Sequence, residues 1–119
     1  NSQAPTDALR SAKEAQAIAK ELGDVSNQAQ ALQASAQVYL VQFSFQEAIR
    51  RANEACELCR AAGDRRAEAE HLKQTADAHM QIAHFDDQRG RRPDPKNLED
   101  ALQAALSSVR IFDSLGADA

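Results

Sequence analysis

The sequence predicts an all-α fold, an α-solenoid of antiparallel helix hairpins with about five helices. Two observations support this prediction. The turn Leu22-Gly23-Asp24 returns 40 residues later as Ala62-Gly63-Asp64, and small and apolar residues recur around both turns at helical steps. A repeat of this length cannot bury its apolar face alone, so it must stack on a neighbouring copy.

The composition fits a globular, alanine-rich helical chain. Of 119 residues, 43% are hydrophobic and 27% are charged. The net charge of −4 argues against binding to nucleic acid or to an anionic membrane, because both favour clustered Lys and Arg. No apolar stretch approaches the length of a membrane span. Two cysteines cannot form a disulfide framework, so we expect a cytoplasmic protein.

The first two helices are expected at residues 6–22 and 25–42. Gly23 suits the left-handed conformation that often follows a helix C-terminus, and Asp24 can cap the next helix. Small and apolar residues follow one another at steps of three and four in both segments. These residues are Ala8, Leu9, Ala12, Ala15 and Ile18 in the first segment, and Ala29, Leu32, Ala36 and Leu40 in the second.

The next two helices are expected at 45–62 and 65–85, where the same pattern returns 40 residues later. Ser44 and Glu47 form a predicted capping box, in which a hydroxyl and a carboxylate satisfy free backbone amides at the helix start. A second glycine-aspartate pair repeats the turn between the helices. The residues that align with the first copy are Ala48, Ile49, Ala52, Ala55 and Leu58, followed by Ala69, Leu72, Ala76 and Met80.

The fifth helix is expected at 98–115, after an inserted polar loop at 86–97. The third copy is displaced by 53 residues, so that Ala48 corresponds to Ala101. The inserted segment contains two prolines and a glycine among arginines, which favours a loop. Asn97 can cap the helix that follows.

One run of residues carries a family resemblance. It comprises Leu32, Ser35, Ala36 and Tyr39 on one helix, and Phe45, Ala48, Ala52 and Ala55 on the next. This pattern resembles the tetratricopeptide repeat (TPR) family, in its variety of about 40 residues. The resemblance implies that Ala36 and Ala48 let the two helices of one repeat touch, while Tyr39 and Phe45 pack between them. HEAT and armadillo units have similar lengths, but their second helices more often carry prolines and larger aliphatic residues.

We expect residues 1–119 to be a single domain from a longer array, since this register makes the first and last helices second helices of a repeat. The last helix has more apolar surface than one neighbour covers. That surface favours either further repeats or a homodimer through the terminal helices. Its apolar residues are Leu98, Leu102, Ala105, Val109 and Phe112 along one line, with Leu106 and Ile111 beside it.

No catalytic, metal or cofactor site is expected. Cys56 and Cys59 have the spacing of a redox motif, but they lie inside a predicted helix, where small packing residues are the favoured interpretation. His71, His79 and His84 do not stand at recognisable ligand intervals from the cysteines, so we interpret them as packing or exposed residues. The chain contains no Gly-rich phosphate loop and no Ser/His/Asp arrangement, so it is not expected to be an enzyme.

One basic stretch stands out, formed by Arg89, Arg91, Arg92 and Lys96. It could contact an acidic partner, a phosphate or RNA. A solvated loop is the simpler interpretation, because the stretch has no interleaved aromatic residues that would stack on bases.

The leading functional hypothesis is a protein–protein interaction module. In the TPR family the first helices of successive repeats line a concave face, so the resemblance implies that a peptide or helix partner binds there. The Lys and Asn clamp of some TPR co-chaperones is missing, because Gln33 and Gln37 stand at those positions. The alternatives are self-association through the terminal helices and regulation of a fused enzyme. The implied binding residues are Gln30, Gln33, Gln37, Val41, Glu70, Lys73, Asp77 and Gln81.

Overall fold

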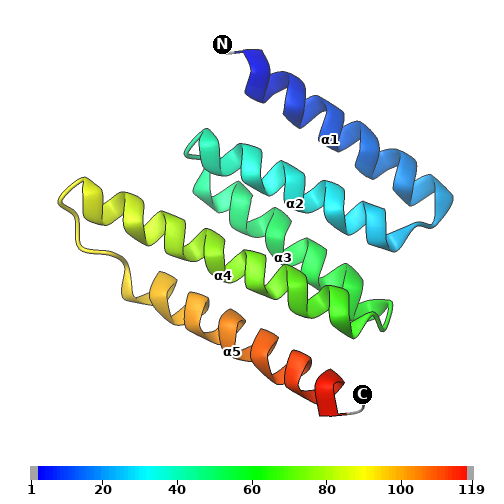
Figure 1. Cartoon of the computed structure of the whole chain (residues 1–119). Helices are drawn as coiled ribbons and strands as arrows, with labels where there is room; N and C mark the ends of the chain where they lie inside the picture. Colours follow the sequence, from blue (N-terminus) through cyan, green and yellow to red (C-terminus); the bar gives the residue numbers. More distant parts are fainter. Residues whose placement is uncertain (1–2, 118–119) are drawn as a thin grey trace.

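The computed structural model describes residues 3–117, which form five α-helices and no β-strand. Successive helices run antiparallel, and each helix packs against the next one along the chain (Figure 1). The prediction of an all-α fold with five helices is confirmed. The helices are α1 (Gln3–Leu22), α2 (Val25–Val41), α3 (Phe45–Ala61), α4 (Arg65–Gln88) and α5 (Pro95–Ala117).

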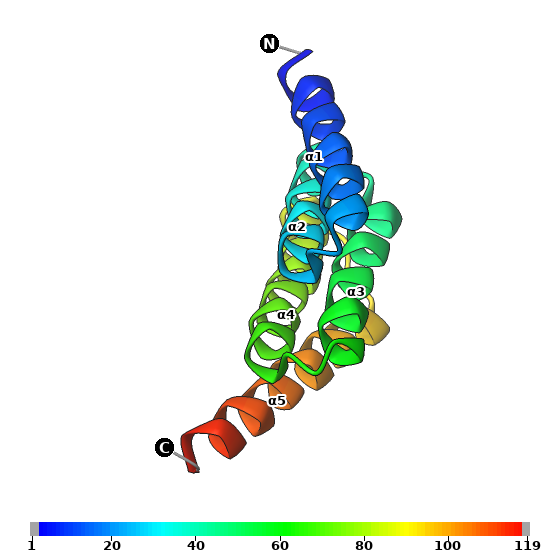
Figure 2. The same ribbon diagram turned by 90° about the vertical axis from the view of Figure 1, so that its right-hand side faces the viewer.

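The helices form an open, elongated array. α2 and α4 lie together on one side, with α3 on the other (Figure 2). Within the described chain, α2 and α4 are also the only helices in contact that are not consecutive. The radius of gyration is 15.1 Å, whereas a compact domain of this length has about 13.5 Å. The packing is therefore between neighbours, and the outer sides of α1 and α5 remain uncovered.

The core is built from small side chains, as the alanine-rich composition predicts. Ala48, Ala52 and Ala55 on α3 are fully buried. Two clusters of buried residues connect the helices, one around Leu32 and one around Leu40. Tyr39 and Phe45 pack against the second cluster, as the repeat pattern implies. Small residues allow close helix packing, and the larger side chains of the two clusters fill the spaces between the helices.

The two glycine-aspartate turns have nearly the same geometry. Gly23 and Gly63 have φ angles of 69° and 76°, in the left-handed region. The Oδ1 atoms of Asp24 and Asp64 each accept a hydrogen bond at 3.1 Å, from the backbone N–H groups of Asn27 and Ala67. The predicted C-terminal glycines and N-terminal aspartate caps are confirmed.

The turn between α2 and α3 has Phe43 in place of the glycine. Its φ of 61° puts a non-glycine residue in the left-handed region, at a cost of about 1–2 kcal/mol. The Phe43 ring packs against the rings of Phe85 and Phe45, with centroid distances of 5.0 and 6.2 Å. These aromatic contacts offset the backbone cost.

The predicted capping box at the start of α3 is wrong. Ser44 is the N-cap residue, but its side chain makes no capping hydrogen bond. Glu47 instead forms ion pairs with Arg50 and Arg51 on its own helix, at 2.9 and 3.3 Å. Side-chain ion pairing therefore replaces the reciprocal bonds to the backbone.

The inserted loop is shorter than predicted, because the helices on both sides of it extend into the segment 86–97. α4 continues to Gln88, and α5 begins at Pro95, so the loop covers only 89–94. Proline is tolerated in the first turn of a helix, and Asp94 Oδ1 caps α5 by accepting a hydrogen bond from Lys96 N–H at 3.0 Å. Asn97 is therefore not the cap, and its Nδ2 donates to the His79 carbonyl oxygen at 2.9 Å.

Candidate functional site

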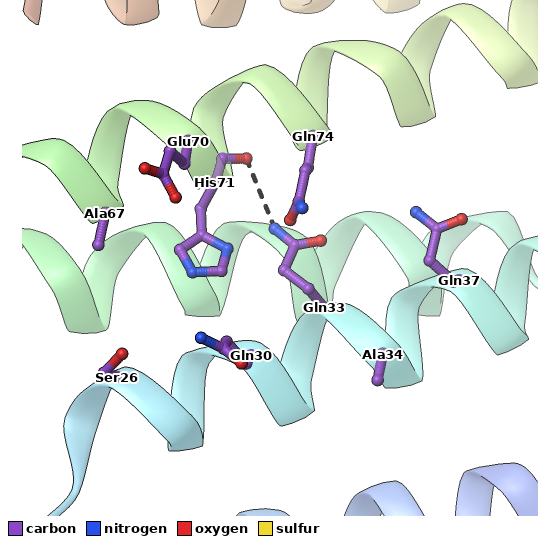
Figure 3. Close-up of a pocket in the computed structure, with 9 residues that line it drawn as sticks. All are labelled: Ser26, Gln30, Gln33, Ala34, Gln37, Ala67, Glu70, His71 and Gln74. Atoms are coloured by element: carbon purple, nitrogen blue, oxygen red, sulfur yellow. Dashed lines mark hydrogen bonds between the residues drawn. The ribbon is translucent and has the colours of Figure 1, made fainter. Parts of the chain in front are cut away.

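A cleft of about 460 Å³, here called the α2–α4 cleft, lies between α2 and α4. The alternation of helices between two sides makes α2 and α4 neighbours, although α3 separates them in the sequence. Side chains from both helices surround the space between them (Figure 3). The lining residues are Ser26, Gln30, Gln33, Ala34 and Gln37 from α2, and Ala67, Glu70, His71 and Gln74 from α4.

The structure brings together half of the residues that the sequence implied for a binding face. Gln30, Gln33, Gln37 and Glu70 line the α2–α4 cleft. The remaining four are exposed on the same two helices, outside the lining of the cleft. These residues are Val41, Lys73, Asp77 and Gln81.

The α4 wall of the cleft was largely missed by the sequence interpretation. Ala67, His71 and Gln74 form this wall, at the i, i+4, i+7 spacing of one helix face. That spacing was the available signal. The implied α4 residues follow a neighbouring stripe, because the sequence establishes the helical period but not the rotation of α4 toward α2.

The α2–α4 cleft is rich in side-chain amides. Gln33 is only 6% exposed, and its Nε2 donates to the His71 carbonyl oxygen at 3.5 Å, so it ties α2 to α4. Gln30, Gln37 and Gln74 are exposed. Each amide offers a carbonyl acceptor and an NH₂ donor. The cleft therefore has one amide that supports its floor and three that remain open to solvent.

The electrostatic character of the cleft comes from one carboxylate. Glu70 is the only charged side chain among the nine lining residues, and it is exposed. Burial lowers the pKa of His71, an effect that the neighbouring Gln74 opposes only in part. The imidazole is thus neutral at neutral pH, and its Nδ1 atom is buried without a hydrogen-bond partner. Glu70 is consequently the one formal charge in the lining of the cleft.

A second cleft, of about 760 Å³, lies where α3, α4 and α5 meet. The apolar side chains of Phe45, Ile49 and Ile82 line it, together with charged groups of both signs. Polar groups at its edge are already paired. Lys96 Nζ lies 3.3 Å from Asp100 Oδ1 and the Lys96 N–H binds Asp94, so this cleft is a weaker candidate.

Both cysteines lie in the helical core. Both thiols are buried and free, and Cys56 Sγ lies 3.5 Å from Thr75 Oγ1. Burial raises the pKa of the Cys56 and Cys59 thiols, which keeps them protonated. The interpretation of both cysteines as packing residues is confirmed.

The remaining candidates are the histidines, possible metal ligands and the basic stretch. His79 is buried and paired with Asn97, as expected for a packing residue. Among residues 3–117, no cluster of three or more His, Cys, Asp or Glu side chains could hold a metal ion. In the basic stretch, the Arg89 guanidinium lies 5.3 Å from the centre of the Phe85 ring, and Arg91 and Arg92 are exposed.

Comparison with models of protein families, with curated proteins and with solved structures finds no match to this chain. None of the helices between residues 3 and 117 combines the length and the apolar content that a membrane span requires. The geometry of the α2–α4 cleft is therefore the basis of the functional proposal.

Proposed function

We propose that this chain is a non-catalytic protein–protein interaction module, a segment of a TPR-like helical solenoid that binds an extended peptide in the α2–α4 cleft. The observation that carries the proposal is the set of open amides on two helices that lie side by side. Further support comes from the two glycine-aspartate turns, whose matching geometry is typical of a structural repeat.

The chemistry of the cleft fits a peptide backbone. An extended peptide presents N–H and C=O groups along both edges, and each needs a partner when it leaves water. Gln30, Gln37 and Gln74 offer both donors and acceptors at successive points along the cleft. Glu70 adds a preference for a peptide with a Lys or Arg side chain near the α4 wall.

Selection from a displayed library of random peptides on the immobilised chain tests the proposal. We expect selected peptides to be enriched in Lys and Arg. Gln37→Ala should weaken their binding about fivefold to tenfold, because one hydrogen bond contributes about 1 kcal/mol. Glu70→Gln should also weaken binding of the basic peptides, because it removes the negative charge that attracts their Lys or Arg side chains.

Lys73→Ala is the matched control, since Lys73 is exposed on α4 outside the cleft. Its affinity for the selected peptides should equal that of the unchanged chain. If no peptide is selected, or if Gln37→Ala and Glu70→Gln bind as tightly as the unchanged chain, the α2–α4 cleft is not the binding site.

A second proposal is self-association through the terminal helices. It is supported by large apolar side chains that are exposed on α1 and α5, including Leu22 at 75% and Val109 at 62%. Sedimentation at several concentrations distinguishes the two proposals. A module that only binds peptides remains a monomer, whereas self-association gives a concentration-dependent dimer.

We also propose a cytoplasmic location. Two free, buried thiols support it, because a reducing compartment keeps cysteines in this state. Expression of the tagged full-length protein followed by fractionation tests the proposal.

A further inference from the structure

α3, the second helix of a repeat, is covered on both sides. It therefore shows which neighbouring helix covers each face of a helix at this repeat position. Toward α2, Ala55 packs in a cluster with Ala29 and Leu32. Phe45 and Ile49 pack in a cluster that contains Ala78 and Ile82 of α4 together with Leu40 and Tyr39 of α2, and both residues line the cleft where α3, α4 and α5 meet. Cys56 Sγ also contacts Thr75 Oγ1 of α4. α3 therefore has one face for the helix before it and another for the helix after it.

On α5 only the first of these faces is covered. Ala101 and Ser108, which correspond to Ala48 and Ala55, are 4% and 5% exposed. Ser108 Oγ donates to the Ala69 carbonyl oxygen of α4 at 2.8 Å. The residues that correspond to Phe45, Ile49 and Cys56 are exposed: Leu98 at 41%, Leu102 at 58% and Val109 at 62%.

α1 shows the opposite pattern of burial to α5, which supports the assignment of the two faces. On α1, Leu9 and Gln16 correspond to Ile49 and Cys56, and they are half-buried against α2. Ala8 and Ala15, which correspond to Ala48 and Ala55, are exposed. The contact of a second helix with the helix that follows it is thus made twice, by α1 with α2 and by α3 with α4.

We propose that the exposed apolar face of α5, formed by Leu98, Leu102 and Val109, docks one amphipathic helix with the residue pattern of α4. The docked helix continues the interface that α1 makes with α2 and α3 makes with α4. This docking surface is separate from the α2–α4 cleft and does not depend on it.

The size of the α5 side chains specifies the partner further. Where α3 presents Cys56 and Cys59 to its neighbours, α5 presents the larger Val109 and Phe112. Helices pack at axial distances of about 8–10 Å, so large residues on one helix require small residues opposite them. The docked helix must therefore carry residues opposite Val109 that are no larger than the Thr75 that contacts Cys56, and branched apolar residues such as Ile82 toward Leu98.

A second copy of the chain does not offer such a helix. Its two first helices, α2 and α4, are already covered on both sides by their neighbours. The end face that α1 leaves open corresponds to the α2-facing side of α3, and it would bring two second helices together. The proposed occupant is therefore an additional amphipathic helix, and a second copy docked on α5, as self-association would require, is the competing outcome of the experimental test.

An extended protein tests this inference. A copy of residues 65–88 is added after Ala119 of the full chain, with Leu72→Glu in the copy so that its outer face stays polar. The chain contains no Trp, so Leu98→Trp places a single indole in the proposed interface. Phe45 is the equivalent residue on α3, so this position accepts an aromatic ring. We expect a blue shift of the emission and a several-fold fall in quenching by acrylamide relative to the unextended variant.

The matched control is the same extension with Ala78→Asp and Ile82→Asp in the copy, which should leave the indole as accessible as in the unextended variant. Val109→Asp in the body of the extended protein should also restore quenching. Equal quenching in the extended and unextended proteins would overturn the proposal. So would a dimer of the unextended chain in sedimentation that Val109→Asp dissociates, because a second copy would then be the occupant.

Discussion

The two terminal helices, α1 and α5, hold the same position in the repeat but expose opposite faces. Leu9 is half-buried on α1, while the corresponding Leu102 is 58% exposed on α5. Ala8 is exposed on α1, while the corresponding Ala101 is 4% exposed. Among the described residues, α1 packs only against α2, which follows it, and α5 packs only against α4, which precedes it.

This difference shows that the neighbour, not the residue type, decides burial at a repeat position. On α5 the polar Ser108 is 5% exposed, whereas the apolar Val109 beside it is 62% exposed. In a stacked array each unit contacts only its neighbours, so an end unit leaves uncovered a surface that an internal unit buries. The same residue change should therefore have different effects at equivalent positions of α1, α3 and α5.

The largest effect is expected in thiol reactivity, because position 109 of α5 corresponds to Cys56 of α3. Val109→Cys should add one rapidly reacting thiol to the native protein. Cys56 and Cys59 should react at least about 100-fold more slowly, since burial raises their pKa values and reaction requires local opening. The rates are measured with a chromogenic disulfide reagent. A fast phase in the unchanged chain would contradict the burial of the α3 thiols.

The next largest effect concerns the equivalent alanines at 8 and 101. Ala101→Leu should destabilise the protein by about 1–3 kcal/mol, because Ala101 is buried in the contact of α5 with α4. Ala8→Leu should change stability by less than about 0.5 kcal/mol, because Ala8 is exposed. Urea unfolding followed by circular dichroism measures both. Equal losses in the two variants would show that α1 is covered on both sides.

For Leu9 and Leu102 the order is reversed, and the larger loss of stability is expected at α1. Leu9→Ala should cost about 1–2 kcal/mol, since part of its side chain is removed from contact with α2. Leu102→Ala should cost less than about 0.5 kcal/mol in the unextended chain, because the side chain faces solvent. The same urea titration applies. A large cost for Leu102→Ala would indicate that the face of α5 is already covered, for example in a dimer.

The smallest effect is expected at the turn that ends α1, and it depends on pH. Hydrogen bonds from the backbone and side chain of Asn27 lower the pKa of Asp24 below its ordinary value of 3.8. A lowered pKa in the folded state adds stability that is complete above the unfolded-state value, and this stability is lost as the pH falls through the lowered value. The contribution of Asp24 should therefore disappear only below about pH 4.

Melting temperatures between about pH 6 and about pH 2.5 measure this effect in the unchanged chain and in Asp24→Asn. Asparagine also caps helices but does not titrate. At pH 6 the unchanged chain should melt at a higher temperature than Asp24→Asn, and this difference should vanish at the acid end of the range. Parallel curves for the two proteins would mean that the Asp24 cap does not depend on its charge.

The local structure was largely predictable from the sequence. The glycine-aspartate turns, the five helices and the packing of Tyr39 and Phe45 depend on residues that lie close together in the chain or repeat with a fixed period. The errors were at helix ends. Ser44 makes no capping bond and Asn97 pairs with His79, because side chains at helix ends have several competing partners.

The candidate site was predicted only in part. The α2 residues Gln30, Gln33 and Gln37 were identified because the repeat register places them on a first helix. His71 and Gln74 were missed because the helical period does not specify how far α4 is rotated toward α2. That rotation results from contacts of α4 with α3 and α5 at the same time.

The number of helices, their turns and the positions of small or apolar side chains follow from the amino-acid sequence, since these properties arise from short-range backbone preferences and from periodicity. Which of these positions are buried depends on how the helices pack. Burial depends on the presence of a neighbouring helix, and a residue can be buried in α3 while the residue at the equivalent repeat position is exposed in α5. The surfaces that we propose to bind partners are the places where the stacking contacts leave polar amides or apolar side chains uncovered.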